Sequence, residues 1–146
     1  MRYDDFLDAD SLARYAAALN QRAGGGQIQL DDLRHLILDS GGRCAWCGAD
    51  LRRVDFEVDH VQPLARGGAH VLANLALACW PCNRQKAAKS PIQFAQEQAV
   101  RGQRTPLVLR LLAAHGLDVL TQRTLFDPPS SSPPLSDDDE PPPYRW

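Results

Sequence analysis

Apolar residues recur at helical spacing in two segments near the start of the chain. In residues 11–21 they fall on one helix face, at positions 12, 15, 16 and 19, and Ser11 is a suitable N-cap. A second helix is predicted to open at Asp31, where acidic side chains suit the positive end of the helix dipole, and to stop at Gly41. We interpret both helices as packing elements without chemistry of their own.

Between residues 43 and 83 the pattern changes to turns and short β-like pieces. Residues 54–59 alternate apolar and acidic side chains, which is typical of a half-buried strand. A turn is indicated at Gly67-Gly68, and an apolar stretch then runs over residues 71–78. This segment therefore differs in architecture from the helices before it.

Three further helices are predicted after residue 79, each introduced by a proline. Pro81 marks the first helix, over residues 80–89, because proline is tolerated in a first helical turn. Ser90-Pro91 starts a helix to about residue 102, and Thr105-Pro106 starts one that ends at His115. The chain thus divides into residues 1–42, 43–89, 90–126 and 127–146.

The last of these segments has a different composition, dominated by proline, serine and acidic residues. Such a segment cannot offset the cost of ordering its backbone, so residues 127–146 are predicted to be disordered. The motif Pro141 to Tyr144 is similar to a WW-domain ligand, but short proline motifs match frequently by chance.

Composition narrows the functional classes. The chain of 146 residues suits one domain, and no apolar run approaches the roughly 20 residues that cross a bilayer. The first residues lack the basic start and apolar block of a signal peptide. We therefore expect a cytoplasmic protein without a membrane partner.

Charge is distributed unevenly. Residues 1–42 carry a net charge of −3, residues 43–126 one of +5 and residues 127–146 one of −4. The basic middle segment suits a polyanionic partner. On charge alone, however, a solvated helix face that carries arginine is the better interpretation.

The four cysteines form two CxxC pairs, Cys44 with Cys47 and Cys79 with Cys82. Each CxxC turn brings two thiolates to one side of a loop, and two turns complete the tetrahedral shell of a structural Zn²⁺. The alternative is redox chemistry at CWPC, which needs a strand–CxxC–helix context in a parallel sheet and leaves the second pair unexplained. We therefore predict one structural zinc.

The 31 residues between the pairs contain further chemistry. They hold DHVQPLARGG from Asp59 and NL at Asn74, and the second pair continues as CNRQK through Asn83. A phosphodiester hydrolase needs a base for water and a cation beside the phosphate. His60, with an ordinary pKa of about 6.5, suits the base, and the oxygens of Asp59 and Asn83 suit a cation.

In this order and spacing the motifs resemble the HNH endonuclease family, the ββα-metal nucleases, in its zinc-knuckle branch. The resemblance covers residues 43–89 and implies an α+β fold with a ββα-metal core, flanked by short helices. It implies that His60 is the general base, that Asp59 and Asn83 hold one divalent ion, and that Asn74 braces the loop and orients the His60 backbone. Because both ligands are oxygen donors, we expect that ion to be Mg²⁺ or Mn²⁺. Adjacent strand residues point to opposite faces, so Asp59 and His60 are expected where the strand bends.

Other polar and aromatic residues receive simpler interpretations. Lys86 is expected to contact DNA phosphate, and Arg84 and Lys89 are expected to make nonspecific phosphate contacts or to be solvated. The remaining histidines are interpreted as structural or exposed, and the aromatic residues of the CxxC turns as covers of the zinc site. These residues are His35, His70 and His115, and Trp46 and Trp80.

The sequence therefore predicts a metal-dependent DNA endonuclease, a hydrolase without an organic cofactor, acting as a monomer or transient dimer. The alternative is a non-catalytic zinc module that binds nucleic acid or another protein. Such a module has no use for Asp59, His60 and Asn83 together.

Overall fold

The computed structural model describes residues 1–25 and 27–117. The segment 127–146, predicted from composition to be disordered, lies outside the described residues. Within them, no helix is long and apolar enough to cross a membrane.

Two helices precede the sheet, α1 (Ala9–Arg22) and α2 (Leu30–Asp39), after a short 3₁₀ helix (Tyr3–Leu7). The predicted apolar face of α1 is confirmed by the burial of Leu12 and Leu19. Its N-cap is Asp8, not Ser11 as expected, because the Asp8 carboxylate accepts a hydrogen bond from the Ser11 amide at 3.1 Å.

The sheet consists of β1 (Phe56–His60) and β2 (Leu75–Cys79), paired antiparallel with Phe56 opposite Cys79 and His60 opposite Leu75. Every residue of β2 is buried, which agrees with its continuous apolar sequence. The connection between the strands contains two 3₁₀ turns, over residues 64–66 and 72–74. One end of the pair therefore meets the cysteines and the other meets His60.

Three helices follow the sheet: α3 (Trp80–Lys86), α4 (Pro91–Val100) and α5 (Pro106–Ala114). The side chains of Ser90 and Thr105 cap α4 and α5, as their sequence pattern indicates. Helix α3 ends three residues earlier than predicted, because Ala87 adopts a left-handed backbone with φ 49°.

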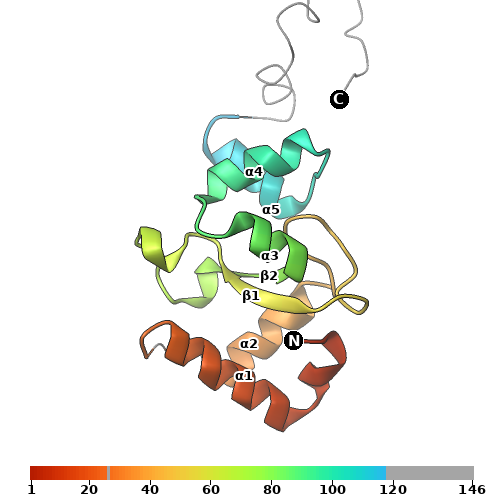
Figure 1. Cartoon of the computed structure of the whole chain (residues 1–146), viewed down its shortest axis with the longest axis vertical. Helices are drawn as coiled ribbons and strands as arrows, with labels where there is room; N and C mark the ends of the chain where they lie inside the picture. Colours follow the sequence, from red (N-terminus) through yellow and green to blue (C-terminus); the bar gives the residue numbers. More distant parts are fainter. Residues whose placement is uncertain (26, 118–146) are drawn as a thin grey trace, which may run out of the picture.

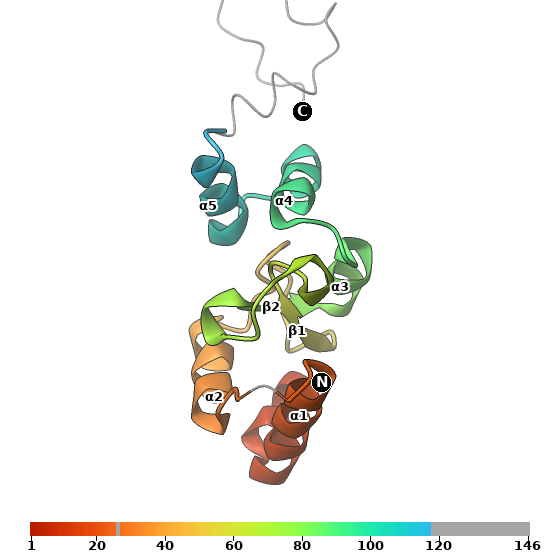
Figure 2. The same cartoon turned by 90° about the vertical axis from the view of Figure 1, so that its left-hand side faces the viewer.

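The sheet and α3 occupy the middle of the molecule (Figures 1 and 2), with α1 and α2 at one end and α4 and α5 at the other. The Tyr15 hydroxyl of α1 accepts a hydrogen bond from the Val58 amide of β1 at 2.9 Å, which ties the N-terminal helices to the sheet. On the opposite side Trp46 packs edge-to-face on Phe94 of α4, with ring centroids 5.0 Å apart. The α+β class predicted from the sequence is confirmed.

Candidate active site and metal centre

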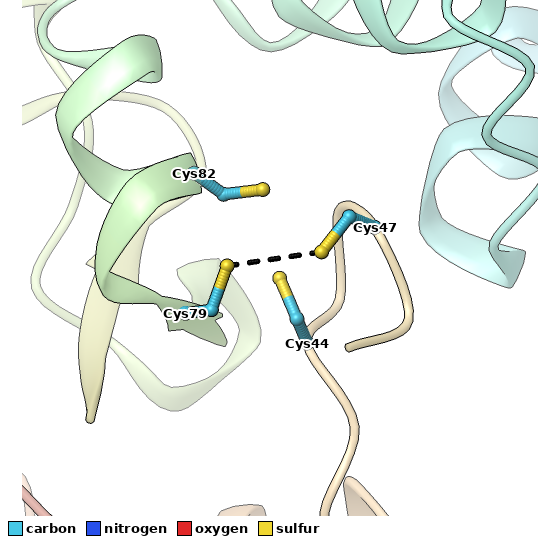
Figure 3. Close-up of side chains that lie close together, drawn as sticks. All are labelled: Cys44, Cys47, Cys79 and Cys82. Carbon is cyan, nitrogen blue, oxygen red and sulfur yellow. Dashed lines mark hydrogen bonds between the residues drawn. The ribbon is translucent and has the colours of Figure 1, made fainter. Parts of the chain in front are cut away.

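The four cysteines converge on one point, and we call them the four-cysteine cluster. Cys44 and Cys47 come from one loop, Cys79 ends β2, and Cys82 lies in the first turn of α3. Their sulfurs all lie within 4.8 Å of one another and point toward a common centre (Figure 3). Cys47 Sγ and Cys79 Sγ are 3.7 Å apart.

This geometry fits zinc. With Zn–S distances of about 2.3 Å, the sulfurs of a tetrahedral site lie about 3.8 Å apart. Without a cation, hydrogen bonds from Cys79 and Cys82 lower the pKa of the Cys44 thiol to about 2, and the resulting thiolate raises the pKa of Cys79 to about 12. A divalent cation removes this conflict because it stabilises all four thiolates together.

Backbone hydrogen bonds shape the first cysteine turn. The Gly48 amide donates to the Cys44 carbonyl and the Cys44 amide donates to the Ala49 carbonyl, both at 2.9 Å. The Ala45 amide donates to Leu77 of β2 at 2.8 Å, so the turn is attached to the sheet edge. The turn therefore lies beside β2 and its terminal cysteine.

Side chains of the C-terminal helices complete the support of this turn. Gln98 of α4 is buried, and its Nε2 donates to the Trp46 carbonyl at 3.0 Å and lies 3.9 Å from Cys82 Sγ. The Thr105 hydroxyl donates to the Ala45 carbonyl at 2.6 Å. Sequence reasoning missed both residues, because the hydrogen bonds from Gln98 to Trp46 and from Thr105 to Ala45 each join residues more than 50 positions apart.

The two tryptophans of the CxxC turns differ from each other. Trp46 is 0% exposed, beside the four-cysteine cluster, as expected of a covering side chain. Trp80 is 47% exposed, and the Arg84 guanidinium lies 4.5 Å from its ring centroid. The expectation that Trp80 covers the zinc site is therefore wrong, because α3 turns that ring outward.

A second site lies along β1 and extends past its His60 end. An open cavity of about 260 Å³, which we call the His60 cavity, gathers polar residues from β1, α3 and α1. Its lining residues are Leu19, Arg22, Glu57, Val58, Asp59, His60, Pro63, Leu64, Asn83 and Ala87. Three of the predicted site residues, Asp59, His60 and Asn83, thus share one cavity.

Asn83 and Glu57 are hydrogen-bonded across this cavity. Asn83 Nδ2 donates to Glu57 Oε2, so the amide of α3 is attached to β1. Sequence reasoning missed Glu57, although the alternation in residues 54–59 could have indicated it, because Glu57 and Asp59 share a strand face. The cavity therefore contains two carboxylates, one of them unpredicted.

Asp59 is buried, and each of its carboxylate oxygens has one protein partner. Its side chain is 7% exposed, Oδ1 lies 3.1 Å from Lys86 Nζ, and Oδ2 accepts a hydrogen bond from Trp46 Nε1 at 3.1 Å. Burial raises the pKa of Asp59, and the Lys86 ammonium opposes that shift. A single aspartate thus connects the His60 cavity to the tryptophan of the cysteine turn.

Lys86 differs from its expected role. The side chain is 0% exposed, and Nζ contacts both Asp59 and, at 2.9 Å, the His60 carbonyl. The expectation of a surface phosphate contact at Lys86 is not met here, because helix α3 directs the ammonium into the sheet. Lys86 is the internal counter-ion of Asp59.

His60 is the last residue of β1, where strand alternation places it on the opposite face from Asp59, although both residues line the cavity. The strand stays regular through both residues, and the chain bends immediately afterwards, at residues 61–62. His60 Nε2 lies 2.8 Å from His70 Nδ1, so His70, interpreted from sequence as structural or exposed, is a direct neighbour of the site. Burial lowers the pKa of His60, and electrostatic interactions with His70, Lys86 and Arg22 lower it further.

Asn74 braces the loop that follows His60. Its Oδ1 accepts from the Gln62 amide at 2.8 Å, and its Nδ2 donates to the carbonyls of Gln62 and Ala69. Gly68 is required in the same loop, because a Cβ there would lie 1.8 Å from the Gln62 carbonyl oxygen. The Asn74 carbonyl also accepts from the Val61 amide at 2.8 Å, so Asn74 holds the two residues that follow His60, and no hydrogen bond joins its side chain to the His60 backbone.

The basic residues near the site are placed differently from one another. Lys89 is half-buried and paired with Glu97 at 2.8 Å, whereas Arg84 is exposed on α3. Arg22, on α1, lines the His60 cavity and is exposed. Sequence reasoning did not indicate Arg22, since nothing in its local sequence shows that α1 reaches the site.

Residues 44–89 match the family model described as HNH endonuclease. The match covers a little under a third of the chain, and it contains both CxxC pairs, the two strands and α3. Neither the comparison with curated proteins nor that with solved structures finds a match. The chain therefore contains an HNH endonuclease domain at residues 44–89, of the branch built on a four-cysteine metal knuckle.

Proposed function

We propose that the protein is a DNA endonuclease that hydrolyses phosphodiester bonds with one divalent ion and His60 as general base. The observation that supports this most directly is the meeting of Asp59, His60 and Asn83 on one cavity within the segment that matches the HNH family. A cavity lined by a histidine and two carboxylates supplies the groups that this reaction requires.

His60 takes the proton of the attacking water in this proposal. Its lowered pKa leaves the imidazole neutral, and so able to accept a proton, at pH 7. Among the described residues no hydrogen bond engages Nδ1, whereas Nε2 is occupied by His70. Nδ1 is therefore the nitrogen that accepts the proton.

Asp59 and Asn83 are the proposed protein ligands of the catalytic ion. Within the described part of the chain, only the four-cysteine cluster brings three or more His, Cys, Asp or Glu side chains to metal-binding distance. A two-oxygen site nevertheless fits Mg²⁺ or Mn²⁺, which keep waters and take phosphate oxygens to complete their shell. Such an ion, when bound, neutralises charge on the scissile phosphate and the leaving oxygen.

The Asp59 carboxylate can serve that site while it holds Lys86. Each of its oxygens accepts one hydrogen bond in the structure, and a carboxylate oxygen has two lone pairs. The contacts to Lys86 and Trp46 fix the orientation of Asp59. Asn83 offers its Oδ1, because Nδ2 is the atom bonded to Glu57.

DNA is the proposed partner, bound through cations around the His60 cavity. Arg22 of α1 lines that cavity, Arg84 of α3 follows the cavity residue Asn83, and both arginines are exposed. We propose that these two arginines contact phosphate and that Lys89 contributes less, because Glu97 already neutralises it. The nuclease acts as a monomer or transient dimer.

Plasmid cleavage tests the proposal. Zinc-loaded protein with Mg²⁺ or Mn²⁺ should nick supercoiled DNA, and EDTA should stop the reaction. His60→Ala should cut about 10²–10⁴-fold more slowly in single-turnover reactions and bind DNA as the wild type does.

The matched control for His60→Ala is His115→Ala, an exposed histidine at the end of α5. The control should cut at the wild-type rate. Wild-type cutting by His60→Ala, or failure of the wild-type protein to cut at all, would leave a zinc-stabilised binding module as the function.

A further inference from the structure

A line of hydrogen bonds connects His60 to helix α1. His60 Nε2 lies 2.8 Å from His70 Nδ1, and His70 Nε2 lies 2.7 Å from Asn20 Oδ1. The three residues come from the end of β1, the following loop and α1. Asn20 lies outside the segment that matches the HNH family, so this connection adds a part of the chain that the family match does not include.

The orientation of the Asn20 amide is fixed by the backbone of Ile28. The Ile28 amide donates to Asn20 Oδ1 at 3.1 Å, and Asn20 Nδ2 donates to the Ile28 carbonyl at 3.0 Å. Exchanging the oxygen and nitrogen of the Asn20 amide would set donor against donor and acceptor against acceptor. The atom that faces His70 is therefore an oxygen, which only accepts.

This direction continues through both imidazoles. Because Asn20 Oδ1 accepts, His70 Nε2 carries a hydrogen and donates. A neutral imidazole carries one hydrogen, so His70 Nδ1 has a lone pair and accepts from His60 Nε2. His60 then has its hydrogen on Nε2 and its lone pair on Nδ1.

We propose that His70 and Asn20 are positioning residues that set the tautomer and ring orientation of His60. The hydrogen bond at one imidazole nitrogen determines which nitrogen is free to act, and here it leaves Nδ1 for the proton of water. The proton passes from the water oxygen to His60 Nδ1, and Nε2–H stays bonded to His70. This inference rests on the proposed role of His60 as general base.

The proposal gives α1 a function that the sequence did not indicate. The helix brings Asn20 to His70 and Arg22 to the rim of the His60 cavity, two residues apart in the chain. The N-terminal helices, interpreted from sequence as packing elements, thus position the base of a catalytic segment that begins more than 20 residues later.

Nitrogen-15 NMR of the full, zinc-loaded chain tests the tautomer without any cleavage reaction. We expect His60 to carry its hydrogen on Nε2 and to show a scalar coupling through the hydrogen bond to His70 Nδ1. A hydrogen on Nδ1 of His60 in the wild-type protein overturns the proposal. This readout stands even if the protein proves not to cut DNA.

Cleavage kinetics test the consequence for the reaction. His70→Phe should lower the single-turnover rate by about 10–100-fold, the range known for hydrogen-bond partners of metal-bound histidines, with DNA affinity unchanged. His115→Phe is the matched control and should change neither. A wild-type rate for a folded His70→Phe variant overturns the proposal.

Asn20 offers a second test that leaves both histidines in place. Asn20→Asp keeps an oxygen acceptor toward His70 and should retain most of the rate, whereas Asn20→Leu removes the acceptor and should lose the Nε2–H preference at His60. Equal rates and equal spectra for Asn20→Asp and Asn20→Leu overturn the proposal. This test does not depend on whether the His70→Phe variant folds. If His60→Ala cuts normally, it is the proposed function that fails.

Discussion

The antiparallel pair of β1 and β2 supports two sites that differ in how closed they are. At the end formed by Phe56 and Cys79, four sulfurs converge within 4.8 Å, and three of the four cysteines are buried. From Glu57 to the end formed by His60 and Leu75, β1 instead lines an open cavity with polar side chains. A closed tetrahedral shell leaves no position for water, whereas an open site does.

The same short sheet thus supports a structural metal site and, apart from it, the proposed catalytic residues. The four-cysteine cluster joins the loop at residue 44 to α3 and, through Gln98, to α4. The four-cysteine cluster therefore helps to hold in place the strand and the helix that line the His60 cavity. Each of the following experiments perturbs one end and asks whether the other responds.

Removal of zinc should have the largest effect. Structural zinc sites have apparent binding free energies of about 10–16 kcal/mol, whereas whole domains are stable by about 5–15 kcal/mol. Cys82→Ser, or strong chelation of the wild type, should therefore unfold residues 44–114. Circular dichroism melts together with the zinc content, expected to be one ion per chain, measure this.

The control for Cys82→Ser is Ala88→Ser, an exposed position just after α3. It should retain zinc and melt as the wild type does. A zinc-free protein that keeps its native melting curve and its DNA cleavage would contradict the structural role of the four-cysteine cluster.

Removal of the buried ammonium tests the connection between the ends. Lys86→Met leaves the Asp59 carboxylate buried with Trp46 as its remaining donor, and should lower the free energy of unfolding by about 3–5 kcal/mol at pH 7. Burial raises the pKa of Asp59, so the deficit should shrink as the pH falls and the carboxyl protonates. Urea unfolding at several pH values measures it.

Two variants accompany that experiment. Lys86→Met with Asp59→Asn removes both charges and should recover most of the lost stability. Lys89→Met breaks the half-exposed pair with Glu97 and should cost no more than about 1 kcal/mol. Equal losses for Lys86→Met and Lys89→Met would mean that the buried pair does not hold the site together.

A smaller effect is expected at the rim of the His60 cavity. Arg22→Ala should weaken DNA binding and reduce the slope of log K against log salt by about 1, because one phosphate contact releases about one counterion. Arg14→Ala, exposed on the same helix but outside the cavity lining, is the control. Identical slopes for the two variants would exclude Arg22 from the DNA interface.

The smallest effect is expected from deletion of residues 127–146. The deletion changes the net charge of the chain from −2 to +2, since the segment carries −4. DNA binding should strengthen modestly at low salt and remain unchanged near physiological salt, where screening is effective beyond about 8 Å. Titrations at both salt concentrations measure this, and loss of cleavage would show that the segment has a role in the site.

Local sequence was sufficient for most of the secondary structure. Helical periodicity located α1 and α2, and the pairs Ser90-Pro91 and Thr105-Pro106 located the starts of α4 and α5. It was less accurate at ends that depend on a single backbone angle, such as the end of α3 before Ala87. Caps and periodicity act between residues a few positions apart, and for this reason they can be recognised in a sequence.

The site divides in the same way. The two CxxC pairs predicted the metal centre, and the ordered motif at Asp59, Asn74 and Asn83 identified the segment that matches the HNH family. Residue type and spacing carry that information, because four thiolates in two CxxC turns complete a tetrahedral zinc shell, and the order of the motif residues is read directly along the chain.

Only the tertiary structure decided how the remaining charges and donors are used. It buried Lys86 against Asp59, joined Trp46 to that aspartate, and brought Asn20 within reach of His70. These contacts join residues 13 to 50 positions apart, and whether a side chain is a surface cation or an internal counter-ion depends on the burial that such packing creates. Burial and long-range distance are properties of the folded chain, and no local pattern in the sequence encodes them.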